Sequence, residues 1–288
     1  MIGPYRRRPG SVLWTLADTA TELLLLPNEA STITITSGAV SQMRDFKNNG
    51  RVFDGAAGSR PTITANALNN KASLTFSGTQ WLTLAGLASV FNMLHTVAGA
   101  GSTIVAVWKA GTNSNPNTFY GLLGNSAFQT LNHGFAMGFD DRLSATRNNS
   151  ALAQIVRGVS GQPTAQNASE DNTHPVNTPA IIVHTSNPAA SLPADRSILR
   201  INGTEFKNNI AIGAASTANA TFPLQIGAAG GNVFPLVGEV FMLSILPPGT
   251  TQDTILRAEG YAAGPVAGWN LQDRLVTGHP YKSAAPTV

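Results

Sequence analysis

The 288-residue chain contains no cysteine and few charged residues. Without cysteine it can form neither a disulfide framework nor a thiolate metal site, and it has no cysteine nucleophile. Only 11% of the residues are charged, whereas 28 are glycine and 17 are proline. This composition is typical of many short strands joined by turns. The lack of cysteine also suits a protein that is made and assembled in a reducing cytoplasm.

Long apolar runs and strong net charge are missing as well. No run approaches the roughly 18 residues of a membrane span, and residues 23–26 are too few for the core of a signal peptide. The net charge is +3, and Arg6, Arg7 and Arg8 account for that excess. We therefore expect neither a membrane partner nor a general affinity for nucleic acid.

Turn signals predict three hairpins. Residues 32–43 and residues 73–84 each consist of two alternating segments around a turn, and in the second hairpin the apolar side chains of both strands would share one face. The strongest signal is Asn202-Gly203, because a type I′ turn favours Asn-Gly at its two central positions.

Residues 240–246 are apolar on both alternating faces, which predicts a central strand covered on both sides. Simple alternation places Phe241, Leu243 and Ile245 on one face and the even-numbered apolar residues on the other. Such a strand lies at the centre of the predicted fold.

A short helix is expected directly after this strand. Thr250 or Thr251 can cap its first turn, and Ile255, Ala258 and Ala262 recur at helical spacing along one face. The chain is therefore expected to end in a strand, a short helix and an anchored tail.

The remaining apolar segments suit a sandwich of two sheets rather than alternating strands and helices. Further strands are predicted at residues 103–108, 120–123, 134–139, 143–146, 180–184, 197–201, 204–206 and 222–226. The predicted core contains Phe76, Phe139, Ile182, Phe241, Leu243 and Ile245.

Residues 44–51 form a predicted polar loop. Its Asn and Gly residues suit positive φ angles, and Asp45 can accept hydrogen bonds from nearby backbone N–H groups. A cation site is the alternative, but a single carboxylate is thin ligation for Ca²⁺, which usually takes about six to eight oxygens. We therefore favour a structural turn and predict no metal and no cofactor.

Residues 157–178 have few large apolar side chains, which predicts a long exposed loop. Within it, Glu170, Asp171, Asn172 and His174 form the densest polar cluster of the chain. A metal or ligand site could be built there, but we favour solvated loop residues.

Trp81 falls on the face opposite Leu82 and Leu84 in a strand. A tryptophan exposed at a sandwich edge can stack on a sugar ring, so Trp81 is the candidate glycan-binding residue. Packing under a neighbouring loop is the alternative that we favour.

Residues 1–27 differ from the rest, and we assign them to an N-terminal arm, or to an initial strand with a short helix, ahead of one domain over residues 28–288. Arg6, Arg7 and Arg8 are the candidate partner-binding residues, because guanidinium groups can pair with carboxylates of a neighbouring protein. A solvated, frayed terminus is the alternative.

The order and spacing of ten short motifs amount to a family resemblance over residues 31–286. The motifs are Ser31-Thr32-Ile33, Gly38-Ala39-Val40-Ser41-Gln42-Met43-Arg44-Asp45, Asn49-Gly50, Arg60-Pro61-Thr62, Phe76-Ser77-Gly78-Thr79, Asn202-Gly203, Gly238-Glu239-Val240, Glu259-Gly260-Tyr261, Trp269 and His279-Pro280-Tyr281. The pattern resembles the laminin-G-like, concanavalin A-like jelly-roll domains of bacteriophage tail and virion proteins. It departs from that family at Met43, where tryptophan is usual, and at residues 26–29, which replace the usual Trp-Leu-Asp-Ala opening.

The resemblance implies an all-β fold, a two-sheet antiparallel jelly-roll sandwich with a short C-terminal helix, in a protein that sits on a virus particle. The expected function is a structural part of the virion, such as a head decoration, neck or tail component. Its expected partners are other virion proteins, its expected location is the virion after assembly in the host cytoplasm, and several copies are expected. The alternative is a lectin-like adhesin that recognises a glycan on the host surface.

We predict no enzyme and therefore no catalytic residue. Glycoside hydrolysis normally needs two carboxyl groups about 5 to 9.5 Å apart. The adjacent pairs Asp140-Asp141 and Glu170-Asp171 would point to opposite faces of a strand. The nucleophile-elbow, zinc-protease and phosphate-loop motifs are absent. A carboxylate pair assembled from distant segments remains an alternative.

Overall fold

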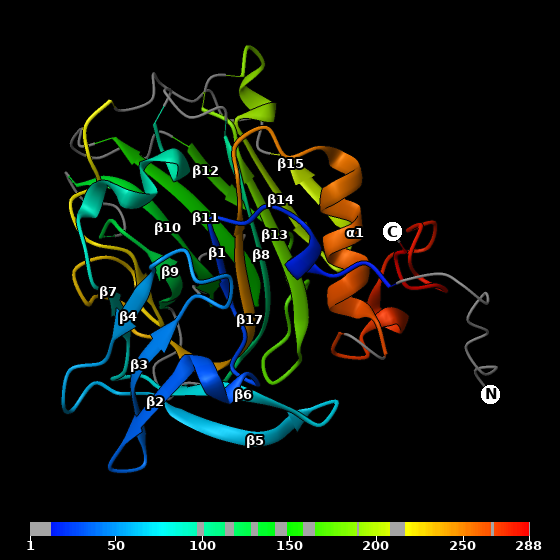
Figure 1. The fold of residues 1–288 in the computed structure, drawn as a ribbon. Coiled ribbons are helices and arrows are strands. Elements are labelled where there is room, and N and C mark those ends of the chain that lie inside the picture. Colours follow the sequence, from blue (N-terminus) through cyan, green and yellow to red (C-terminus); the bar gives the residue numbers. More distant parts are fainter. Residues whose placement is uncertain are drawn as a thin grey trace.

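The computed structural model describes residues 13–96, 101–112, 118–127, 132–141, 149–157, 165–188, 190–207, 217–265 and 268–287. These segments form two antiparallel sheets packed face to face (Figure 1). The predicted all-β sandwich is therefore confirmed. Short 3₁₀ segments lie at η1 Leu16–Asp18, η2 Ala30–Thr32, η3 Ala88–Leu94, η4 Pro193–Asp195 and η5 Gln272–Arg274.

One sheet has eight strands in the order β15-β14-β13-β8-β17-β6-β5, and β1 also pairs with β17. Its strands are β1 Leu23–Leu25, β5 Thr62–Leu68, β6 Lys71–Ser77, β8 Ser102–Ala110, β13 Ala180–Ser186, β14 Ser197–Ile201, β15 Thr204–Lys207 and β17 Val237–Leu246. We call it the inner sheet, because other elements cover both of its faces.

The second sheet has nine strands in the order β12-β11-β10-β9-β16-β7-β4-β3-β2. Its strands are β2 Ile33–Thr36, β3 Ala39–Arg44, β4 Val52–Asp54, β7 Leu82–Leu84, β9 Phe119–Gly124, β10 His133–Asp140, β11 Ser150–Arg157, β12 Ala165–Ala168 and β16 Gln225–Ile226. We call it the outer sheet. Residues 143–146, a predicted strand, lie outside the described residues.

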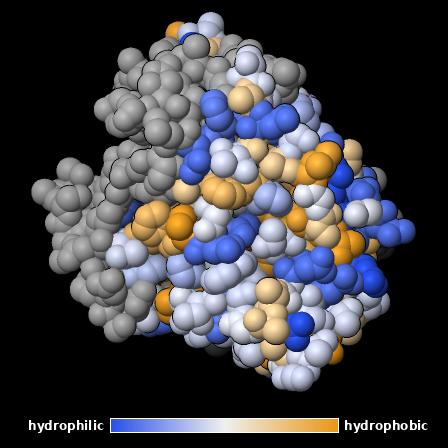
Figure 2. Space-filling view, turned by 90° about the vertical axis from the view of Figure 1, so that its left-hand side faces the viewer, coloured by the Kyte–Doolittle hydropathy of each residue, from blue (hydrophilic) through white to orange (hydrophobic). Residues whose placement is uncertain are grey.

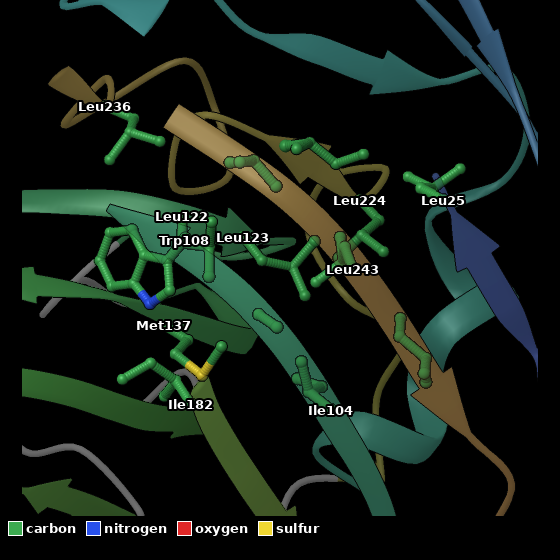
Figure 3. Packing of buried hydrophobic residues seen from close by; sticks show 14 of the residues in the cluster. Leu25, Ile104, Trp108, Leu122, Leu123, Met137, Ile182, Leu224, Leu236 and Leu243 are labelled. Atoms are coloured by element: carbon green, nitrogen blue, oxygen red, sulfur yellow. The ribbon is translucent and has the colours of Figure 1, made fainter. Parts of the chain in front are cut away.

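The main core lies between the two sheets. Figure 3 shows Trp108, Ile182 and Leu243 of the inner sheet close to Leu123 and Met137 of the outer sheet. All six residues predicted for the core are buried. Because strand side chains alternate between faces, each sheet contributes about every second residue to this layer.

A second apolar layer covers the far face of the inner sheet. The helix α1 Gln252–Ala263 and the C-terminal segment lie against this sheet on one side of the molecule (Figure 1). Ile255, Ala258 and Ala262 face it, as the helical spacing predicts. Thr251 is the N-cap, and its hydroxyl accepts a hydrogen bond from the N–H of Thr254.

The central strand β17 is buried on both faces, as predicted, but the predicted faces are wrong for Val240 and Phe241. A bulge between Val240 and Met242 breaks the alternation. Val240, Leu243 and Ile245 therefore face the main core, while Phe241 lies in the second apolar layer.

Two predicted hairpins are confirmed, and one is wrong. Ser37-Gly38 joins β2 to β3 and Asn202-Gly203 joins β14 to β15, with positive φ angles at all four residues. Residues 73–84 do not form a hairpin, because β6 belongs to the inner sheet and β7 to the outer sheet. The apolar residues of both strands still meet in the core, because each strand turns one face toward the space between the sheets.

The described residues before Asn28 belong to the folded body. Trp14 and Leu16 are buried in the second apolar layer, and β1 extends the inner sheet beside β17. Of the two interpretations of this segment, the initial strand with a short 3₁₀ turn is the one found in residues 13–27.

The predicted long loop at residues 157–178 is only partly right, because it contains strand β12. Glu170, Asp171 and Asn172 are exposed, as expected for loop residues. His174 is fully buried instead and stacks on Trp108, with ring centroids 4.7 Å apart.

Candidate functional site

A row of polar side chains crosses the solvent-facing side of the outer sheet. Gln42 pairs with Asp54, Asp54 with Thr83, and Thr83 with Gln225, on the adjacent strands β3, β4, β7 and β16. Each of the four is next in sequence to at least one residue that is buried in the main core. Strand alternation therefore places its side chain on the opposite, solvent-facing side of the sheet. We call these four residues together with Asn232 the polar row.

Hydrogen bonds within the polar row hold its side chains in place. The Nε2 group of Gln225 donates to Thr83 Oγ1 at 3.0 Å and also to Asn232 Oδ1, and Gln225 Oε1 accepts from the backbone N–H of Asn232 at 2.9 Å. Asn232 has a positive φ of 62°, which asparagine tolerates well. At the other end of the row, Gln42 Nε2 donates to Asp54 Oδ1 at 3.0 Å.

The polar row is accessible to a ligand. Asp54 and Asn232 are exposed, Gln42 and Thr83 are half-buried, and only Gln225 is buried, at 4% exposure. Figure 2 shows the side of the molecule on which β4, β7 and β9 lie, where hydrophilic and hydrophobic residues are intermixed. Such a surface can hydrogen-bond a polar ligand and contact its apolar parts.

Trp81, the predicted glycan-binding residue, lies next to this row. It precedes β7 by one residue, so alternation places it on the same side as Thr83, opposite the buried Leu82. Its backbone N–H donates to the carbonyl of Ser59 at 2.9 Å, and its side chain is half-buried. The glycan-binding role of Trp81 stays a prediction. The row was not predicted, because its members come from four separate segments of the sequence.

The candidate partner-binding residues Arg6, Arg7 and Arg8 lie outside the described residues. Asp45 has the structural role that the sequence analysis favours: Oδ1 accepts from the N–H of Leu24 at 2.7 Å, and Oδ2 accepts from that of Asn49 at 2.9 Å. In the described part of the chain, no three His, Asp or Glu side chains are grouped so that they could hold a metal ion. Nor does any helix there have the length and apolar character to cross a membrane.

A buried ionic network fastens the C-terminal segment to the inner sheet. Arg200 donates to both carboxylate oxygens of Glu259, at 2.9 and 3.0 Å, and to the carbonyl of Gly203 at 3.0 Å. His279 Nδ1 accepts from the N–H of Tyr281 at 3.2 Å, so Nε2 carries the hydrogen and donates to Glu259 Oε2 at 3.0 Å. Burial lowers the pKa of Arg200, but the bonds and charge of Glu259 outweigh it and raise that pKa overall.

This network unites three of the motifs that carry the family resemblance. The turn at Gly203 lies against the ring of His279, because a Cβ at Gly203 would come within 2.8 Å of it. Gly260 lies against Tyr281, and a Cβ there would meet the tyrosine at 2.4 Å. These motifs therefore maintain the fold and form no part of the polar row.

Among the described residues, three buried histidines have the largest pKa shifts. Burial lowers the pKa of His174 to about 3, assisted by the charge of Arg274, and lowers that of His184 to about 3. Burial also lowers the pKa of His95 to about 4, against a hydrogen bond to the carbonyl of Ala218. All three side chains lie in the interior, so their titration bears on stability rather than on the polar row.

Comparison with protein-family models and with curated proteins finds no match. Among solved structures, Trypanosoma rangeli sialidase in complex with the inhibitor DANA has a TM-score of 0.51 at 14% identity, over 85% of this chain and 33% of that chain. A mutant of the NanB sialidase from Streptococcus pneumoniae has a TM-score of 0.43 at 15% identity, over 64% and 26%. The CBM40 of Ruminococcus gnavus IT-sialidase, bound to alpha2,3 sialyllactose, has a TM-score of 0.44 at 11% identity, over 63% and 92%.

The sheet order and the likeness to the trypanosomal protein define the class: an antiparallel β-sandwich of the concanavalin-like, jelly-roll type. The chain covers 26% of the length of the NanB sialidase. At these identities the likeness concerns the fold alone. What the chain binds has to be argued from its own residues.

Proposed function

We propose that this chain is a carbohydrate-binding attachment domain of a bacteriophage particle. The carbohydrate-binding part of this proposal rests on the polar row, whose hydrogen-bonding side chains are already held in place on an accessible face of the outer sheet. Sugar hydroxyls both donate and accept, so they suit amide, hydroxyl and carboxylate partners. Because the row is preorganised, little side-chain entropy is lost on binding.

Trp81 supports the same proposal from the edge of the row. Its half-buried ring, on the side of Thr83, can cover the apolar face of a sugar ring while its buried part keeps it rigid. The phage context comes from the family resemblance of the sequence.

A titration of the purified protein against a panel of host-surface glycans tests this function. Replacing Thr83 with valine removes one hydroxyl and keeps the shape, so we expect a loss of affinity on the order of tenfold. Thr64→Val on β5, at the edge of the inner sheet, is the matched control and should bind normally. Equal affinities for wild type and Thr83→Val would exclude the row as the binding site.

We also propose that the protein does not cleave its ligand. Asp54 is the one carboxylate among the five residues of the row, whereas glycoside hydrolysis normally takes two carboxyl groups on either side of the bond. Prolonged incubation with a bound glycan should therefore release no new reducing ends. Steady release that is lost in Asp54→Asn would contradict this proposal.

The second candidate is a structural part of the virion, held by protein contacts. In its favour, three motifs of the phage resemblance meet in the Glu259 network, which points to a shared architecture. Under this proposal Arg6, Arg7 and Arg8 dock the protein on carboxylates of a neighbouring virion protein during assembly in the host cytoplasm.

Electron microscopy of the particle separates the two candidates. Copies on every capsomer or in a ring at the neck would favour the structural role, and a few copies at a distal tip would favour attachment. Deleting residues 1–10 should leave thermal melting unchanged but abolish incorporation into particles. Normal incorporation of the truncated protein into particles would exclude a docking role for residues 1–10.

A further inference from the structure

We infer that the polar row selects a neutral, linear oligosaccharide that lies across the strands, from Asn232 toward Gln42. This inference rests on the proposed glycan-binding function and names its ligand class. It follows from the direction of the hydrogen bonds within the row, from the spacing of its residues and from its charge.

One end of the row presents donors. The backbone N–H of Asn232 can only donate, so it fixes Oε1 of Gln225 on its own side and turns Nε2 toward Thr83 and Asn232 Oδ1. Asn232 Oδ1 is thereby used, and its Nδ2 group is left to face the solvent. Thr83 Oγ1 accepts from Gln225, so its own O–H remains to donate outward.

The other end presents acceptors. An ionised carboxylate only accepts, so Gln42 must turn Nε2 toward Asp54, which leaves its carbonyl oxygen and the second hydrogen of Nε2 for a ligand. Asp54 Oδ1 takes this bond, and among the described residues no partner is found for Oδ2. From Asn232 to Gln42 the order is therefore donor, donor, acceptor and, at Gln42, an acceptor beside one remaining N–H donor.

The spacing of the row matches a chain of sugars rather than a single ring. Neighbouring strands are about 4.8 Å apart, so the four strands of the row span about 14 Å from β16 to β3. One strand spacing is close to the length of one sugar unit in a linear chain. We therefore expect contacts to about three consecutive units.

The charge of the row disfavours acidic sugars. A ligand carboxylate seated at the centre of the row would lie against the exposed carboxylate of Asp54, and like charges repel. Arg44 points to the same side of the sheet, but it lies beside Val52, two pairs beyond Gln42 and Asp54 along the strands. We therefore assign the row to neutral sugars and include acidic ones in the test.

Asp54→Asn distinguishes the two ligand classes by the sign of its effect. The probes are linear neutral oligosaccharides of one to five units, with glucose, N-acetylglucosamine or galactose as the repeating unit, and sialyllactose as the acidic probe. For a neutral ligand the substitution weakens binding at least about fivefold, because an amide oxygen accepts more weakly than a carboxylate. For an acidic ligand it strengthens binding, because the repulsion disappears.

Two further readouts complete the experiment. Affinity should rise from one unit to about three and then level off, and the side-chain amide signals of Asn232 and Gln42 should shift in NMR spectra on titration. Asp195→Asn is the matched control, because Asp195 ends η4 and is paired with Lys207 of β15, an inner-sheet strand that contributes nothing to the polar row. An unchanged melting temperature would show that Asp54→Asn is folded.

The outcomes separate this inference from the proposed function. Stronger binding of sialyllactose than of any neutral probe, increased further in Asp54→Asn, would overturn the neutral ligand class and keep the glycan-binding function. Affinity that does not grow beyond one unit would overturn the linear arrangement. If no glycan of a broad panel binds the wild-type protein, the proposed function fails and this inference fails with it.

Discussion

Glu259 of α1 holds Arg200 of β14 through both carboxylate oxygens, at 2.9 and 3.0 Å, in a place where Glu259 is fully buried. The pair connects the helix that covers the inner sheet to a strand of that sheet. A buried charge without its partner is costly, so each residue depends on the other.

We expect Glu259→Gln to destabilise the fold strongly, because it removes the buried counter-charge of Arg200 and leaves the guanidinium with the more exposed carboxylate of Glu205. The free energy of unfolding should fall by about 3 to 5 kcal/mol in urea denaturation. Asp253→Asn is the control: it breaks an exposed pair with Arg257 on the same helix and should cost about 0.5 kcal/mol or less. Equal losses in the two variants would contradict a structural role for the buried pair.

Gly260→Ala tests the close contact between α1 and the C-terminal segment. A Cβ at this position would lie 2.4 Å from the Cβ of Tyr281, so the segment has to move. We expect a loss of about 1 to 3 kcal/mol in the same assay. Gly264→Ala, where the nearest atoms are 3.4 Å away, should have little effect, and a larger loss there would argue against this packing.

As the pH falls, the protein should begin to lose stability at pH values above those at which carboxylates titrate. The folded-state pKa values of His95, His174 and His184 lie below the usual 6.5, so their neutral form is favoured in the fold. The unfolded chain binds protons first as the pH falls through 6.5, and stability is then lost until the pH reaches about 3 to 4. Each group contributes at most about 1.4 kcal/mol per pH unit in that window. Urea midpoints that stay constant between pH 7.5 and pH 5 would disprove this prediction.

His174→Phe should leave the protein as stable as before at pH 7, or more stable by about 1 kcal/mol. Neither ring nitrogen of His174 has a hydrogen-bond partner among the described residues, and a phenyl ring can keep the stacking on Trp108 without a buried polar atom. The free energy of unfolding of this variant should also depend less on pH than that of the wild type. His184→Phe is the comparison, because it removes the bond between Nε2 and Ser197 Oγ at 2.8 Å and should destabilise. A large loss in His174→Phe would mean that its nitrogens are satisfied by a group such as buried water.

Much of the fold follows from local sequence signals. The Asn202-Gly203 turn, the Thr251 cap and the doubly apolar strand at residues 240–246 are all found as predicted. Each depends on interactions within a few residues: a positive φ angle, a capping hydroxyl and an alternating pattern. Such signals are present in the chain before it folds.

Other features depend on which strands pair. The segments at residues 73–77 and 82–84 look like one hairpin, but they enter different sheets, because pairing with β17 and with β4 and β16 competes with the local turn. The bulge between Val240 and Met242 also arises in strand pairing, here between β17 and β8, and it changes which face of β17 carries Val240 and which carries Phe241. Local alternation cannot anticipate either result.

The sequence by itself determined the class of fold, the helix and its cap, and the core residues. Only the tertiary structure assembled the polar row, because Gln42, Asp54, Thr83 and Gln225 lie far apart in the sequence and become neighbours only through strand register. Strand register depends on long-range pairing and on the shared burial of opposite faces. The position of a polar residue in an alternating strand therefore indicates on which face of the sheet its side chain lies, but not which residues of other strands will lie beside it.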